Sequence, residues 1–173
     1  PRFFMTKSAA NTSRSPQRLF WGRPDCGDMP KLVSTATPSR MAARLELPQS
    51  PEAVCWNPAN NRVYCAVGYP DAYGAVVVID GATNAVLDTL LVGYDMPGGL
   101  CPDARNGRVY CAGSSYYPLD DSLVTVIAGD TVAAQVPVGS GPMALALNPG
   151  GDRLYVACQL PNKVYVIDLV SDT

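Results

Sequence analysis

Tyrosine and aspartate residues gather in three short segments of this 173-residue chain, and they are its best candidates for binding chemistry. They are Tyr69, Asp71, Tyr73, Tyr94, Asp95, Tyr116, Tyr117, Asp120 and Asp121. Aromatic rings combined with carboxylates suit sugars, cationic peptides or a hard cation such as calcium. Polar loops of an acidic protein would have the same composition, so both interpretations stay open.

The sequence contains no histidine, which removes several classes of catalysis. Ser-His-Asp and Cys-His nucleophiles, His-ligated zinc and haem held through histidine all need an imidazole. No other catalytic constellation is visible in the sequence. We therefore expect a non-enzymatic protein that needs no cofactor, with calcium left open as a ligand.

An internal repeat of about 45 residues organises the chain after residue 50. Residues 57–66 recur as 102–112 and 148–157, so that Tyr64, Tyr110 and Tyr155 lie 46 and 45 residues apart. Each repeat holds short β-branched runs separated by turn residues, and no window has a helical period. The third runs are residues 76–80, 124–127 and 164–168, and the fourth are 86–92 and 132–138.

Four short strands in each repeat of this length are typical of a β-propeller blade. We therefore predict an all-β fold, a β-propeller built of four-stranded antiparallel blades, of which the chain holds about four. Blades are expected at 51–96, 97–141 and 142–173, the last without its outer strand. Residues 1–50 form either a degenerate first blade, with 41–47 as its closing strand, or a basic leader.

The second and third strands of the repeat resemble the YVTN family of β-propeller repeats. The matching segments are 64–67, 110–113 and 155–158, with Asp80 and Asp168 ending the third strand. Cysteine in the second strand and Ala128 in place of the third-strand aspartate depart from the family pattern. The resemblance implies a surface-layer-like, secreted or periplasmic protein of bacteria or archaea, and hence an extracytoplasmic location. A minority of such propellers belong to dehydrogenase-like and haem enzymes.

The strand order explains where the tyrosine and aspartate segments lie. In an antiparallel meander, the loops between second and third strands share one face with the links between blades. We therefore expect these residues to form a loop face that binds a protein or a glycan. The alternative is the propeller portion of a hydrolase or quinone-type oxidoreductase with an axial pocket.

The repeated tyrosines and arginines are expected to be structural. These are Tyr64, Tyr110, Tyr155, Arg62, Arg108 and Arg153. A tyrosine in the same slot of every blade suits packing between blades, with its hydroxyl reaching a partner at the edge. An open arc of blades exposes apolar faces, so we expect further blades, a second copy or the first-unit strands to complete a ring.

The cysteines invite a metal or disulfide interpretation, yet none forms a CxxC pair. They are Cys26, Cys55, Cys65, Cys101, Cys111 and Cys158. In a hairpin that turns between residues 57 and 62, Cys55 lies opposite Tyr64 and its side chain points away from that of Cys65. A disulfide within a blade is therefore disfavoured. We expect buried free thiols first, disulfides second and a metal site last.

Two further signals point away from nucleotides and nucleic acids. Residues 139–144 fit the G-x-G-x-x-G/A pattern, but the repeat predicts a strand where a dinucleotide site needs a helix. The net charge of −2 divides into +6 for residues 1–44 and −8 for the rest, and the basic residues are dispersed. No apolar stretch approaches the roughly 18 residues of a membrane span. We expect neither a nucleic-acid partner nor a membrane span.

Overall fold

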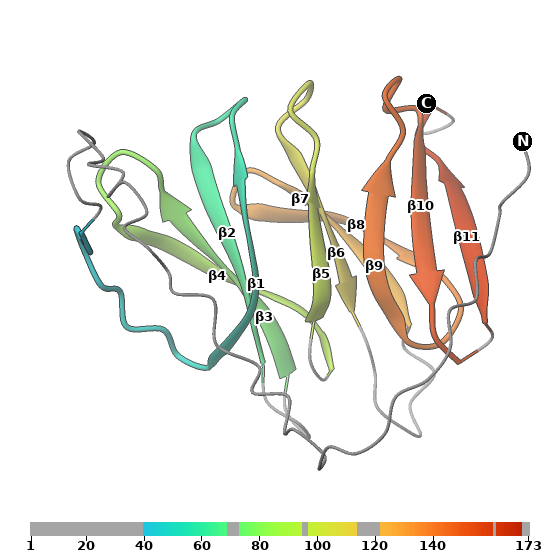
Figure 1. Cartoon of the computed structure of the whole chain (residues 1–173), viewed down its shortest axis with the longest axis horizontal. Coiled ribbons are helices and arrows are strands. Elements are labelled where there is room, and N and C mark those ends of the chain that lie inside the picture. The colour runs from blue at the N-terminus through green and yellow to red at the C-terminus, as the bar shows by residue number, and fades with distance from the viewer. Residues whose placement is uncertain (1–39, 69–72, 95–96, 114–121, 161, 171–173) are drawn as a thin grey trace, which may run out of the picture. The chain divides into compact units, whose positions relative to one another are not determined.

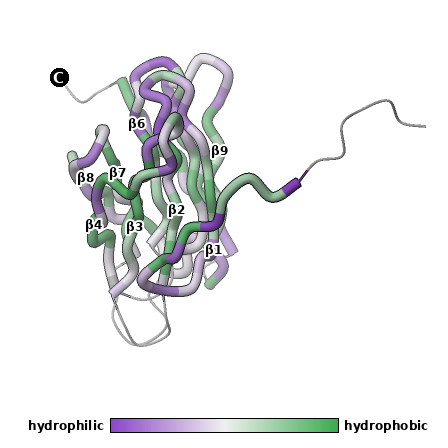
Figure 2. Tube along the Cα trace, turned by 90° about the vertical axis from the view of Figure 1, so that its left-hand side faces the viewer, coloured by the Kyte–Doolittle hydropathy of each residue, from purple (hydrophilic) through white to green (hydrophobic). Residues whose placement is uncertain are grey.

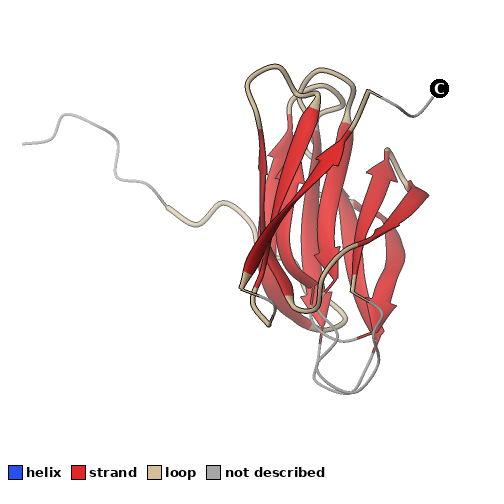
Figure 3. Ribbon diagram, turned by 90° about the vertical axis from the view of Figure 1, so that its right-hand side faces the viewer, coloured by secondary structure: helices blue, strands red, loops and turns tan. Residues whose placement is uncertain are grey.

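The structure, a computed structural model, describes residues 40–68, 73–94, 97–113, 122–160 and 162–170. The chain divides into two compact units, Pro1–Ala42 and Ala43–Thr173, and the strands of the described residues all lie in the second. Within this described part there are strands, turns and loops but no helix (Figure 3). The prediction of an all-β fold is confirmed.

Three antiparallel sheets follow one another along the second unit (Figure 1). The first contains β1 (Ser50–Asn57), β2 (Arg62–Gly68), β3 (Tyr73–Asp80) and β4 (Val86–Tyr94). The second contains β5 (Pro97–Pro102), β6 (Arg108–Gly113), β7 (Leu123–Ala128) and β8 (Thr131–Pro137). The third contains β9 (Pro142–Leu147), β10 (Arg153–Cys158) and β11 (Lys163–Asp168). Each sheet is a meander, as expected of a blade.

The strand register agrees with the hairpin predicted from the sequence. Cys55 lies opposite Tyr64 in the first sheet, and Cys101 lies opposite Tyr110 in the second. Pro142–Leu147 is a strand, so the glycine pattern at 139–144 does not open a helix. The turns are tight because Asn61 and Gly107 adopt left-handed backbone, with φ of 51° and 74°.

Each sheet has two faces with different residues, and their alternation builds the core. We call the face that carries Tyr64, Tyr110 or Tyr155 the tyrosine face, and the other the opposite face. The tyrosine face of the first sheet packs on the opposite face of the second, around Val109 and Cys111. The tyrosine face of the second packs in the same way on the third, around Leu154 and Val156. Figure 2 shows the hydrophobic residues along the strands and the hydrophilic ones concentrated at turns.

One predicted strand is absent. Residues 41–47, expected to fill a closing-strand slot, form no strand. Leu45 and Leu47 pack on the opposite face of the first sheet, against the cluster of Cys65, Val67 and Val77. Among the described residues no strand pairs with this segment, so it packs through its side chains alone. The rest of the expected first blade lies outside the described residues.

No described helix is long and apolar enough to cross a membrane.

Candidate functional site

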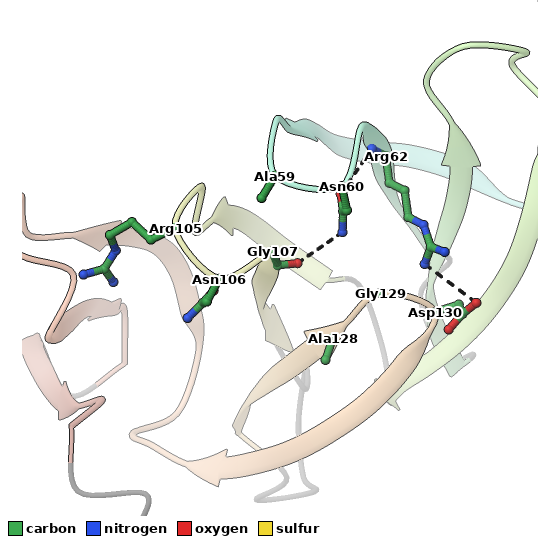
Figure 4. Close-up of a pocket in the computed structure, with 9 residues that line it drawn as sticks. All are labelled: Ala59, Asn60, Arg62, Arg105, Asn106, Gly107, Ala128, Gly129 and Asp130. Atoms are coloured by element: carbon green, nitrogen blue, oxygen red, sulfur yellow. Dashed lines mark hydrogen bonds and ion pairs between the residues drawn. The ribbon is translucent and has the colours of Figure 1, made fainter.

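A pocket of about 480 Å³ opens where turns of the first two sheets meet (Figure 4). It is formed by the β1–β2 turn, the β5–β6 turn and the β7–β8 turn. Its lining residues are Ala59, Asn60, Arg62, Arg105, Asn106, Gly107, Ala128, Gly129 and Asp130. The volume lies within the roughly 300–1,000 Å³ typical of small-molecule sites.

Tyr64 and Asn60 hold the three turns together. The ring of Tyr64 is fully buried between the sheets, and its hydroxyl donates to the Gly129 carbonyl at 3.0 Å. Asn60 Nδ2 donates to the Tyr64 hydroxyl at 2.9 Å and to the Gly107 carbonyl at 3.2 Å. The walls of the pocket are therefore fixed by bonds between residues that are far apart in the sequence.

Asn57 adds a second link behind the pocket. This side chain is fully buried, and its Nδ2 donates to the carbonyls of Arg108 at 3.0 Å and Asp103 at 3.3 Å. Its Oδ1 accepts from the Ala59 amide at 3.0 Å. One side chain thus links the backbone of two sheets, and it gives the Arg108 and Asp103 carbonyls a second donor beside the backbone amides that they already accept from.

Arg62 carries a hydrogen-bond donor in the pocket that has no acceptor among the described residues. Its guanidinium points toward Asp130 (Figure 4), with Nη1 at 3.7 Å from Oδ2, an ion-pair distance that is too long for a hydrogen bond. Nη1 is buried and has no hydrogen-bond partner among the described residues. A buried donor without a partner is expensive, so an acceptor atom that reached Nη1 would remove an unfavourable contribution to stability.

Arg105 lines the pocket but its charge is used elsewhere. Its guanidinium points away from the other lining side chains (Figure 4) and donates to the carboxylate of Asp103 through Nε at 2.9 Å and Nη2 at 2.8 Å. It also contacts the Gly150 and Gly151 carbonyls of the third sheet. Hydrogen bonds from Arg105 lower the pKa of Asp103, so this carboxylate stays ionised at neutral pH.

Two arginines and three aspartates surround the pocket. Arg105 is paired with Asp103, while Arg62 lies between Asp130 and its cross-strand neighbour Asp80. No surplus positive charge is left to select an anion. The pocket therefore offers the buried N–H donor of Arg62 beside the carboxylate of Asp130, and together they match groups that both donate and accept. The amide of Asn106 is already used, because its Oδ1 accepts from the Arg108 amide at 2.9 Å.

The loop face predicted from the sequence lies mostly outside the described residues. This holds for Tyr69, Asp71, Asp95, Tyr116, Tyr117, Asp120 and Asp121. Tyr73 and Tyr94 are cross-strand partners at the end of β3 and β4, and the Tyr73 side chain is exposed. Within the described part of the chain, no group of three or more acidic or cysteine side chains is placed to hold a metal.

The repeated tyrosines and arginines do not all have the same environment. Tyr64 and Tyr110 are buried between sheets, whereas Tyr155 is 38% exposed. Arg62 lines the pocket, and Arg153 is exposed at the end of β10. The third-strand Asp80 accepts bonds from the Ala82 and Thr83 amides, so it stabilises a turn.

The five described cysteines are free thiols and lie in the core or at its margin. Desolvation raises the pKa of Cys55 to about 12, with further contributions from Cys101 and Cys65. Desolvation likewise raises the pKa of Cys111 to about 12. Protonated thiols are poor nucleophiles and metal ligands, which fits the expected role as small buried apolar residues. Cys26 lies outside the described residues.

Three residues of the pocket carried no functional signal in the sequence. Asn60 and Asn106 are of a residue type that is common in turns, and Asp130 follows a glycine in another turn. Their convergence depends on how neighbouring sheets dock. The one sequence feature that marked a pocket residue was the arginine at position 62, which recurs at the same position of each repeat.

No protein-family model matches this chain, and no curated protein is significantly similar to it. Solved structures do match its fold. A protein of unknown function from Desulfotomaculum acetoxidans has a TM-score of 0.64 and 17% identity, over 80% of this chain and 44% of its own. Hydrazine synthase of Kuenenia stuttgartiensis has a TM-score of 0.57 and 18% identity, over 77% and 36%. A eukaryotic initiation factor has a TM-score of 0.54 and 13% identity, over 75% and 33%.

These likenesses concern the fold alone. The Desulfotomaculum protein and hydrazine synthase are β-rich, and the present chain spans less than half the length of each of the three proteins. Similarity at this level of identity carries no activity from one protein to another.

Proposed function

We propose that this chain is a non-enzymatic binding scaffold of β-propeller blades, related to the YVTN repeats, which binds the sugar units of a glycan in the pocket between its first two sheets. It belongs to an extracytoplasmic protein, as the YVTN-like repeats suggest. The observation that carries the proposal is the buried, unpaired Nη1 of Arg62 in a pocket without surplus positive charge.

A sugar suits this pocket better than an anion does. A hydroxyl group can accept from Arg62 Nη1 and donate to the Asp130 carboxylate at the same time. A phosphate or carboxylate could also accept from Arg62, but it would face Asp130 at close range. The hydroxyl therefore satisfies both groups, and the anion only one.

The binding test adds neutral monosaccharides and disaccharides to the protein and detects binding by saturation-transfer NMR. Inorganic phosphate and acetate are the comparison ligands. We expect a neutral sugar to bind and the two anions not to compete. Arg62→Gln and Asp130→Asn should each weaken sugar binding by about tenfold, since each removes a hydrogen bond to a charged group.

Arg108→Gln is the matched control, because Arg108 is the repeat-equivalent arginine and does not line the pocket. It should leave sugar binding unchanged. Binding of phosphate in place of sugar, the absence of any sugar ligand, or equal effects of Arg62→Gln and Arg108→Gln would each overturn the proposed site. Thermal melting of each variant separates lost binding from lost folding.

A further inference from the structure

The tyrosine face of the third sheet is apolar, and no strand of the described residues packs over it. The strand register places its residues in two rows across β9, β10 and β11. One row is Ala146, Tyr155 and Val166, and the other is Ala144, Ala157 and Val164. Tyr155, Val166 and Val164 are 38%, 54% and 63% exposed.

The same rows are covered in the other two sheets. Tyr64 lies between Cys55 and Val78 in the first sheet, and Tyr110 lies between Cys101 and Val126 in the second. Both tyrosines are at most 1% exposed, because the next sheet packs over them. The repeat therefore builds a sheet-binding surface, and within the described part of the chain no further sheet packs on that surface of the third sheet. Exposed apolar patches of this kind mark interaction sites.

We propose that this face binds a second copy of the chain through the same face, across a two-fold axis. Two sheets then stack about 10 Å apart, as in a β-sandwich. Two-fold dimers are the commonest protein assemblies and need a self-complementary surface.

The charges at the end of the face have that self-complementarity. Arg153 of β10 and Asp168 of β11 are cross-strand partners, both exposed, on the same side as Tyr155 and Val166. A two-fold axis that runs along the strands between β10 and β11 places Arg153 of one copy over Asp168 of the other. The same axis places Tyr155 over Val166.

A head-to-tail contact would use the opposite face of the first sheet in the second copy. Leu45 and Leu47 cover part of that face and pack against its buried cluster, while Val54 and Trp56 of β1 on the same face are 69% and 54% exposed. A copy docking over the whole face would have to displace Leu45 and Leu47. The face-to-face arrangement needs no such displacement, because both partner surfaces are already exposed.

The test measures the solution mass of the full 173-residue chain by light scattering over a range of concentrations. We expect a monomer–dimer equilibrium. Val164→Lys should weaken the dimer by at least about tenfold, since it buries a charge in the apolar row. Leu91→Lys is the matched control: Leu91 is 65% exposed on β4, away from this face, and its substitution should leave the dimer intact.

A charge-reversal pair tests the two-fold geometry. Arg153→Asp and Asp168→Arg should each dissociate the dimer, because like charges then face each other. Mixing the two variants should restore it, since every facing pair becomes opposite in charge. Rescue by mixing cannot come from the cross-strand pair within one sheet, which both variants lack.

Three results would overturn this assignment. They are a wild-type monomer at all concentrations, a closed assembly of more than two copies, and no rescue on mixing. A dimer that persists in both Val164→Lys and the charge variants would assign the contact to another surface, such as the outer edge of β11. Sugar binding by a monomer would leave the proposed function standing while this inference fails.

Discussion

Tyr64 combines two roles. Its ring fills the space between two sheets, and its hydroxyl joins the turns that line the pocket. The sequence predicted the packing role from the position of the tyrosine in the repeat. It could not predict the bond to Gly129, because that carbonyl belongs to a turn of the next sheet.

Tyr64→Phe should lower the free energy of unfolding by about 1 kcal/mol. The substitution keeps the ring but leaves Asn60 Nδ2 and the Gly129 carbonyl short of a partner. Urea denaturation measures the change. Tyr155→Phe is the control, since Tyr155 is partly exposed and should lose little. Equal losses in the two variants would contradict the role given to the Tyr64 hydroxyl.

Asp103 should make stability depend on acid pH. Its side chain is 2% exposed, and hydrogen bonds from Arg105 lower its pKa in the folded state. The unfolded value is about 3.9, so the stabilisation is complete above that pH. It is lost as the pH falls through the lower folded pKa.

The expected result is that Asp103→Asn is less stable than wild type at pH 7 and that the two proteins converge in acid. Chemical denaturation at a series of pH values gives the two curves. A constant difference between them across the acid range would show that the Asp103 charge contributes nothing.

At the scale of elements, the inner strands approach one another closely, with β1 beside β5 and β5 beside β9. Gly99 makes the second contact: a Cβ added there would lie 2.8 Å from the Met143 carbonyl oxygen of β9. That neighbour is backbone and cannot move aside alone.

Gly99→Ala should therefore lower the free energy of unfolding by about 1–3 kcal/mol. Gly113→Ala in β6 is the matched control, because its new Cβ would meet backbone oxygens only at 3.5 and 3.6 Å. Thermal or urea unfolding compares the two. A loss at residue 113 as large as that at residue 99 would mean that the close approach of β5 and β9 is not what matters.

Strand positions were more predictable than the way in which the sheets are covered. β-branched runs at a fixed spacing predicted β3, β7 and β11, and the hairpin turns predicted β2, β6 and β10. Residues 41–47 have a similar apolar character but form no strand: Leu45 and Leu47 pack on a face, and no described strand pairs with the segment. Local pattern does not distinguish an edge-pairing segment from a face-covering one.

For the molecule as a whole, the two proposed sites are separate because they are formed by different sheets. The pocket is formed by turns of the first and second sheets, while the proposed dimer face lies on the third. The sequence repeat predicted equivalent sheets, but it could not show that the turns of only one pair enclose Arg62 and Asp130.

Val164→Lys should therefore produce a monomer whose affinity for the sugar equals that of wild type. Calorimetric titration of both proteins with the same sugar measures this, and Arg62→Gln provides the converse variant, a dimer that binds weakly. A large change in sugar affinity on dissociation would show that the sites are coupled.

The meander topology has a mechanical consequence. In the first sheet, Ser50 pairs with Gly68 and Tyr73 pairs with Tyr94, so the sheet begins and ends at the same end of its strands. Tension applied to those two ends acts across the strands, along the direction of the hydrogen bonds. The bonds then break one after another, like a zipper, instead of sharing the load. Pulled in an optical trap, the sheet should open at low force in small steps, and a single rupture at high force would contradict this expectation.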